Sequence, residues 1–229
     1  MRTLITIFIG YIAMCSGCQN NEANDFSICN DIIIDAGCGS LTGEYCLFGF
    51  KWGEGNNFST TGPDATGPML PGGELTFSFQ DEATTLDLLQ EDSVSTLPFS
   101  ALPEYARDSI RSAFQRWESV ADISFVEDSA RIDSNIKIYI ADVSSGGNGF
   151  PRFSDSPCDA LNGIIILDPA VSNALTPEVF RAYALHEIGH VMGLGHCQAG
   201  NLMSTQSQRT GVTDLQPGDV EGILQIYGN

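Results

Sequence analysis

The stretch HEIGHVMGLGH, residues 186–196, carries the chemistry of this chain and decides how the rest of it is interpreted. His186 and His190 are four residues apart, so on a helix both imidazoles project from one face, one turn apart. This spacing lets two side chains reach a single metal ion. Glu187 is rotated around the helix from His186, which places its carboxylate beside the metal position, where it can hold and deprotonate a water molecule.

The second half of the stretch supplies a third ligand. Gly193 can adopt backbone conformations that other residues avoid, so the helix can end there and the chain can bring His196 back towards the metal position. Three neutral imidazoles leave one position of a tetrahedral zinc ion open, the arrangement of a catalytic site. Because all three histidines of the chain fall inside this motif, a chance HExxH helix is a poor explanation of it.

The stretch resembles the metzincin signature HExxHxxGxxH, and Met203 in NLMS resembles the Met-turn that lies under the metal in that clan. Within the clan, bacterial-type matrixins match best. SIRSAFQRWESVADISFVE (109–127) resembles their first helix and second strand, NIKIYIA (135–141) the next strand, and DLQPGDVEGILQIYG (214–228) the closing helix. The resemblance spans residues 74–229 and implies a catalytic domain there.

The patterning of apolar residues predicts an α/β or α+β domain. Alternation from Glu74 to Phe79 predicts a half-buried strand, and apolar residues from Ile110 to Val120 recur at the spacing of a packing helix. Further strands are expected at residues 123–126, 136–140 and 163–167; an active-site helix is expected after Thr176, and a closing helix that buries Val220, Ile223, Leu224 and Tyr227. The resemblance adds a twisted, mostly parallel sheet.

The region before the domain divides into two parts. Residues 1–17 combine Arg2 with a short apolar run, as a signal peptide does, and the sequence that ends at Cys18 resembles a lipobox. Residues 18–73 form a cysteine-containing segment and a Gly/Pro-rich linker. We therefore expect export and a lipid anchor on Cys18 at a bacterial cell surface or outer membrane, with simple secretion as the alternative.

Five cysteines follow Cys18 in the sequence: Cys29, Cys38, Cys46, Cys158 and Cys197. Because their number is odd, at least one of them has no partner among the others, and sequence alone does not give the pairing. A bond between Cys158 and Cys197 would staple the loop beside the site, and the first three can pair among themselves. Cys38 is also a candidate for blocking the zinc in a latent form.

The net charge and the composition of one loop limit which partners and metal ions are expected. With 29 acidic and 10 basic side chains the net charge is −19, so nucleic acid is not expected as a partner. The expected partner of this protein, taken as a monomer, is a protein or peptide substrate. The segment that corresponds by resemblance to the structural zinc and calcium loops of matrixins, residues 144–169, contains no histidine, so a second histidine-bound zinc is not expected. Asp155, Asp159 and Asp168 offer oxygens for calcium, with solvated loop acids as the alternative.

These observations predict a zinc metalloendopeptidase that hydrolyses peptide bonds of extracellular or surface proteins. One zinc ion is expected on the three histidines, with Glu187 as general base and Gly193 and Met203 in support. By resemblance, the substrate lies extended along an edge strand near residues 150–153. The alternatives are a catalytically silent binding protein on the same scaffold and, ranked last, a zinc scavenger, because no histidine lies outside the motif.

Overall fold

The computed structural model describes residues 43–47, 52, 74–87, 93–129, 134–143, 147–153 and 160–228. The strands are β1 (Glu74–Phe79), β2 (Thr85–Asp87), β3 (Ser93–Leu97), β4 (Ser124–Glu127), β5 (Ile136–Ala141), β6 (Gly147–Phe153) and β7 (Ala160–Leu167). The helices are α1 (Ala106–Glu118), α2 (Pro169–Ser172), α3 (Pro177–Val191), α4 (Ser207–Thr210) and α5 (Pro217–Tyr227), with a 3-10 turn at Phe99–Ala101. The expected signal peptide and Cys18 lie outside the described residues.

The seven strands form one mixed sheet, in which β4, β1, β5 and β7 are parallel neighbours in that order. Strand β6 runs antiparallel to β7, and β3 pairs antiparallel with the end of β5 beyond β1. The prediction of a mostly parallel sheet with an active-site helix, a packing helix and a closing helix is therefore confirmed. Patterning did not predict the β2–β3 hairpin, and β6 was expected only from the family resemblance.

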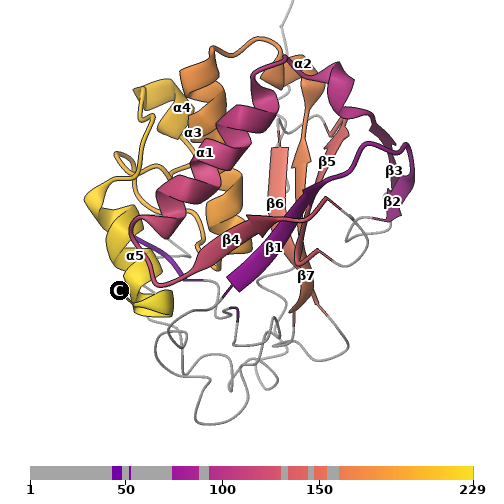
Figure 1. The fold of residues 1–229 in the computed structure, drawn as a ribbon. Helices are drawn as coiled ribbons and strands as arrows, with labels where there is room; N and C mark the ends of the chain where they lie inside the picture. Colours follow the sequence, from indigo (N-terminus) through magenta and orange to yellow (C-terminus); the bar gives the residue numbers. More distant parts are fainter. Residues whose placement is uncertain are drawn as a thin grey trace, which may run out of the picture.

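Helices α1 and α3 lie side by side and cover one face of the sheet (Figure 1). Ile136, Ile138 and Ile140 of β5 are fully buried in the core that includes these helices. Helix α1 buries the face that its sequence predicts, including Phe114 and Trp117, but it ends at Glu118, before the expected Val120. The alternation of β5 and the period of α1 thus fix how the two layers meet.

The β2–β3 hairpin explains why β7 is apolar at consecutive positions. Ile165 and Leu167 belong to the core under the helices, whereas Ile164 and Ile166 form a second cluster, against which Leu86, Val94 and Tyr139 pack. A strand that is covered on both faces loses the apolar-polar alternation of a half-exposed strand.

The closing helix buries two of the four apolar residues that were expected to be buried, and its buried face is rotated from the expected one. Ile223, Ile226 and Tyr227 are buried, whereas Val220 and Leu224 are only partly covered. The face is rotated because Asp219 and Gly222 also point inward, where they contact parts of the site described below. No helix in the described ranges is both long enough and apolar enough to cross a membrane.

Removing buried volume from the centre of the sheet should destabilise the whole domain. Ile138 has no exposed surface and lies between β1 and β7, so Ile138→Ala should lower the free energy of unfolding by about 2 to 5 kcal/mol. Val126→Ala on β4, where the side chain is 44% exposed, should change it by less than about 0.5 kcal/mol. Urea denaturation measures both values, and equal losses would contradict this account of the core.

Candidate metal centre

Helix α3 begins and ends at the residues that the sequence indicates. The Thr176 hydroxyl oxygen accepts a hydrogen bond from the Val179 N–H at 3.4 Å, and Pro177 occupies the first helical position. The helix ends at Val191, and Gly193 follows with φ of 107°, a left-handed conformation that favours glycine. This turn reverses the chain, and His196 lies beside His186 and His190.

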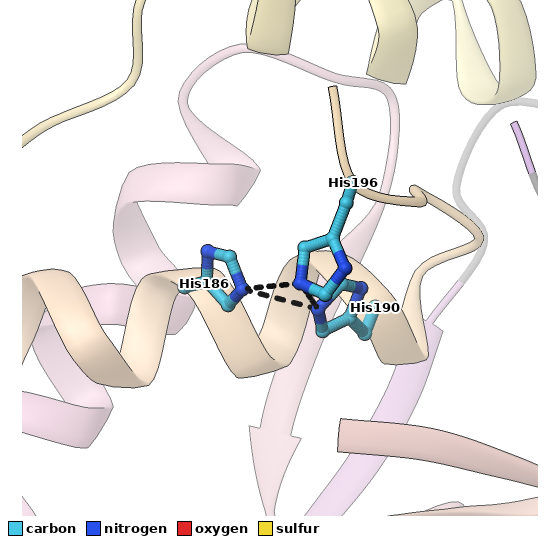
Figure 2. A group of neighbouring side chains, drawn as sticks. All are labelled: His186, His190 and His196. Carbon is cyan, nitrogen blue, oxygen red and sulfur yellow. Dashed lines mark hydrogen bonds between the residues drawn. The ribbon is translucent and has the colours of Figure 1, made fainter. Parts of the chain in front are cut away.

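The three histidine side chains converge on one point (Figure 2). The Nε2 atoms of His186 and His190 are 3.1 Å apart, those of His190 and His196 are 3.2 Å apart, and those of His186 and His196 are 3.3 Å apart. Among the described residues, these three form the one group of histidine, cysteine and acidic side chains arranged to hold a metal ion.

Two backbone carbonyls fix which nitrogens face the centre. The Nδ1–H of His186 donates to the Leu202 carbonyl at 2.7 Å, and the Nδ1–H of His190 donates to the Leu194 carbonyl at 2.8 Å. A neutral imidazole that carries its proton on Nδ1 has a lone pair on Nε2. The Nε2 lone pairs of these two residues therefore point at each other, which is unfavourable unless a cation lies between them.

The separation of the Nε2 atoms fits a tetrahedral zinc ion. Zn–N bonds of about 2.0 to 2.1 Å separate two ligands of a tetrahedron by about 3.3 to 3.4 Å, close to the 3.1 to 3.3 Å found here. The electrostatics fit as well. Burial lowers the pKa of all three imidazoles, to about 4 for His196, so the ligand set is neutral at physiological pH. These residues could therefore hold zinc.

Glu187 lies on α3 next to the first histidine and is only 5% exposed. Burial raises the pKa of its carboxyl to about 8, and the N–H of Gly149 in β6 acts in the opposite direction. Gly149 permits this approach, because a Cβ at that position would overlap the Glu187 carbonyl. Strand β6 therefore passes directly over the helix at the expected general base.

Met203, which the resemblance places under the metal, packs against the helix that carries two of the histidines. Its side chain is 2% exposed, and its Sδ atom occupies the space that a Cβ on Gly189 would need. The same position is bordered by the Trp117 ring of α1. A thioether suits this contact because it adapts to the shape of its neighbours. Gly189 thus allows Met203 to reach the backbone of α3 directly before His190.

Asp219 of α5 is a supporting residue that the sequence interpretation missed. Its carboxylate oxygens accept hydrogen bonds from the N–H groups of Leu202 at 2.8 Å, Met203 at 2.9 Å and Gln216 at 2.8 Å. Leu202 in turn provides the carbonyl that orients His186. An acidic residue four positions before the buried Ile223 was the available signal.

Two expectations outside the motif are changed by the structure. Cys197 is a buried free thiol, so it does not pair with Cys158, and burial raises its pKa to about 12. Asp168 is the N-cap of α2, and its oxygens accept hydrogen bonds from the N–H groups of Val143, Ala170 and Val171. This role accounts for Asp168 without calcium. The other two candidates, residues 155 and 159, lie outside the described residues.

Neutralising Asp219 should loosen the turn that contains Met203. In Asp219→Asn one acceptor oxygen becomes an amide group, which leaves a buried N–H without its partner and should lower the free energy of unfolding by about 1 to 3 kcal/mol. Glu221→Gln, on the exposed side of the same helix, makes the same chemical change and should have little effect. Urea denaturation compares the two, and a comparable loss in both would refute the role of Asp219.

Comparisons with known proteins agree with this geometry. A family model for matrixins matches residues 93–228. Metalloendoproteinase 4-MMP of Arabidopsis thaliana is 30% identical over 172 residues, 68% of this chain and 46% of the relative. Metalloendoproteinase 1 of Glycine max is 30% identical over 152 residues, which are 57% of this chain and 48% of the relative. Human matrix metalloproteinase-19 is 29% identical over 149 residues, which are 59% of this chain and 28% of the relative. The chain spans less than half the length of these curated relatives, but the family model covers more than half of the chain, which therefore belongs to the matrixin family.

Proposed function

We propose that this protein is a zinc-dependent metalloendopeptidase, with zinc bound by His186, His190 and His196. One observation carries the proposal: the three Nε2 atoms lie within 3.3 Å of one another, while backbone carbonyls accept hydrogen bonds from the Nδ1–H groups of two of the rings. The names of the plant and human relatives support the same activity. A structural zinc site would close the coordination shell with a fourth side chain, and no fourth ligand lies with the three histidines among the described residues.

The chemistry is then divided between the metal and Glu187. When bound, zinc would supply Lewis acidity towards the scissile carbonyl and a water molecule. Glu187 would take the proton of the attacking water and pass it to the leaving amine. Its buried position suits this role if the bound cation offsets the desolvation that raises the pKa of the carboxyl, because the carboxylate is then ionised and can accept a proton. The Gly149 N–H beside the carboxyl helps to fix its position.

The substrate would bind along β6. Within the described part of the chain, β6 pairs with β7 and no other strand, so its second edge offers backbone groups to an extended peptide. The strand passes over Glu187 at Gly149, which would bring the peptide bond of a paired substrate close to the general base. This arrangement supports an endopeptidase, because an extended strand can continue on both sides of the scissile bond.

The setting of this activity is also proposed. Export by the signal peptide at residues 1–17, a lipid on Cys18 and a monomeric state would place the protease among extracellular or surface proteins as its substrates. This part of the proposal is supported by the sequence features of the N-terminal residues alone. A membrane fraction that loses the protein after Cys18→Ala would support the anchor.

Replacing the general base should separate metal binding from catalysis. Glu187→Gln keeps the shape of the side chain but cannot accept the proton, so kcat for a quenched peptide library should fall by at least about 100-fold. Zinc content, measured by metal analysis, should remain one ion per chain. The control Glu178→Gln, exposed in the first turn of α3, should retain both properties. Zinc binding without cleavage by the parent would favour the silent binding protein instead.

Metal removal should affect both cleavage and stability. A ligand that binds only the folded state stabilises it, so a strong chelator should abolish cleavage and lower the thermal unfolding midpoint of the parent. Zinc should restore both, because the three histidines are the one group arranged to hold a metal ion among the described residues. The unfolding midpoint of Glu187→Gln should respond to zinc as the parent does. An unchanged midpoint in the parent would argue against a zinc site on these histidines.

A further inference from the structure

The segment Gly43–Leu47, here called the strap, lies against the metal site although the family model begins at residue 93. It is the indigo segment beside α5 in Figure 1. The sequence interpretation placed it in an N-terminal segment ahead of the catalytic domain. Its Cys46 and Leu47 are 2% and 3% exposed, so it is packed as tightly as the core of the domain.

The strap pairs with the loop that carries the third histidine. Leu47 forms an antiparallel bridge with Leu194, and the Gly195 N–H donates to the Cys46 carbonyl at 2.9 Å. On the other side of His196, the Gln198 N–H donates to the Gly43 carbonyl at 2.9 Å. The backbone of the loop is therefore fixed to the strap both before and after the ligand.

His196 depends on this backbone support more than the other two ligands do. His186 and His190 sit on α3, and each has its Nδ1–H bound to a carbonyl. Within the described part of the chain, the close polar contacts of the His196 ring are those of its Nε2 atom with the Nε2 atoms of the other two histidines. Its position is thus set by the course of residues 194–198, which the strap holds.

Helix α5 is shaped to receive the strap. A Cβ on Gly218 would overlap the Glu44 carbonyl oxygen, and a Cβ on Gly222 would lie 2.8 Å from the Cβ of Tyr45. Glycine inside a helix costs about 0.5 to 1 kcal/mol relative to alanine, so two of them one turn apart need a reason. The docked strap provides it. The side-chain amide of Asn201 adds a hydrogen bond to the Glu44 carbonyl at 3.0 Å.

A disulfide at Cys46 and the hydrogen bonds of Trp52 also hold the strap and the chain after it. Cys46 is disulfide-bonded. Beyond the strap, the indole N–H of Trp52 donates to the Val191 carbonyl at 3.1 Å, and the backbone N–H of Trp52 donates to the Tyr227 hydroxyl, which itself donates to the Met192 carbonyl. These contacts cap the C-terminal end of α3 directly after His190. The N-terminal region therefore touches both parts of the chain that carry the histidines.

We propose that the strap is a positioning element for His196 and that, together with the Cys46 disulfide, it sets the affinity of the site for zinc. The functional unit would accordingly include Gly43–Leu47 in addition to the domain from Glu74. This inference rests on the proposed zinc site. It concerns how the third ligand is held and does not depend on turnover, so it can fail while the peptidase proposal stands.

The test uses the full chain with substitutions that push the strap away from α5. Gly222→Ala should raise the zinc dissociation constant, measured by competition with a chelator, by about 10-fold or more, because partners that orient ligands contribute about 10- to 100-fold to metal affinity. Hydrogen exchange of peptides that cover residues 193–199 should become faster. Gln225→Ala, on the exposed side of the same helix, should leave both values unchanged.

The direction of the stability change adds a second readout. Without a docked strap, Gly222→Ala would stabilise α5, because alanine is the better helix former. With a docked strap it should instead lower the unfolding midpoint while weakening zinc binding. Higher stability with unchanged zinc affinity would overturn the inference.

Cys46→Ser, which removes the disulfide without adding bulk, decides the matter if Gly222→Ala does not fold. It should also weaken zinc binding and speed exchange in residues 193–199, and parental values would overturn the role of the disulfide and the strap. If the parent itself binds no zinc, the proposed function fails first. If the parent binds zinc and cleaves peptides while all variants match its affinity, only the strap inference fails.

Discussion

The arrangement of the site depends on one electrostatic constraint: imidazole lone pairs are brought together at a single buried point. With the Nδ1 protons of His186 and His190 bound to carbonyls, their Nε2 atoms present negative density to each other at 3.1 Å. Only a cation makes that arrangement favourable. The fold therefore has to hold the ligands in place at a local cost in the absence of metal, and the neighbouring elements can be understood as the means of doing so.

Helix α5 connects most of these elements. Asp219 fixes the backbone of Leu202 and Met203, and Leu202 orients His186. The Tyr227 hydroxyl donates to the Met192 carbonyl at the end of α3. Gly218 and Gly222 leave room for the strap, which pairs with the loop around His196. Helix α5 contributes no ligand, but it supports the surroundings of all three histidines. This explains why its inner face carries an acidic residue and two glycines.

The sequence predicted the site better than its surroundings, for a physical reason. Ligand spacing on a helix and a glycine at a chain reversal are local features, so His186, His190, Gly193 and His196 could be placed from residue order alone. The role of Asp219 depends on a turn 16 residues away, and the strap depends on contacts with residues about 150 positions later. Those roles leave only indirect traces, such as glycines inside a helix and a tryptophan inside a Gly/Pro-rich region. The short β2–β3 hairpin was missed because its apolar side chains are few and its partner face belongs to β7.

The strap can affect the affinity for metal because it changes how often the loop holds His196 in its liganding position. If the loop with His196 occupies its liganding position for only a fraction of the time, the apparent dissociation constant for the metal rises by the inverse of that fraction. A 10-fold change requires only about 1.4 kcal/mol of loop stability, roughly the contribution of one or two backbone hydrogen bonds. The Gly195 and Gln198 N–H groups make two such bonds to the strap. A segment remote in sequence from the histidines can therefore tune the metal site without touching the metal, because it acts on the free energy of the loop that presents the ligand.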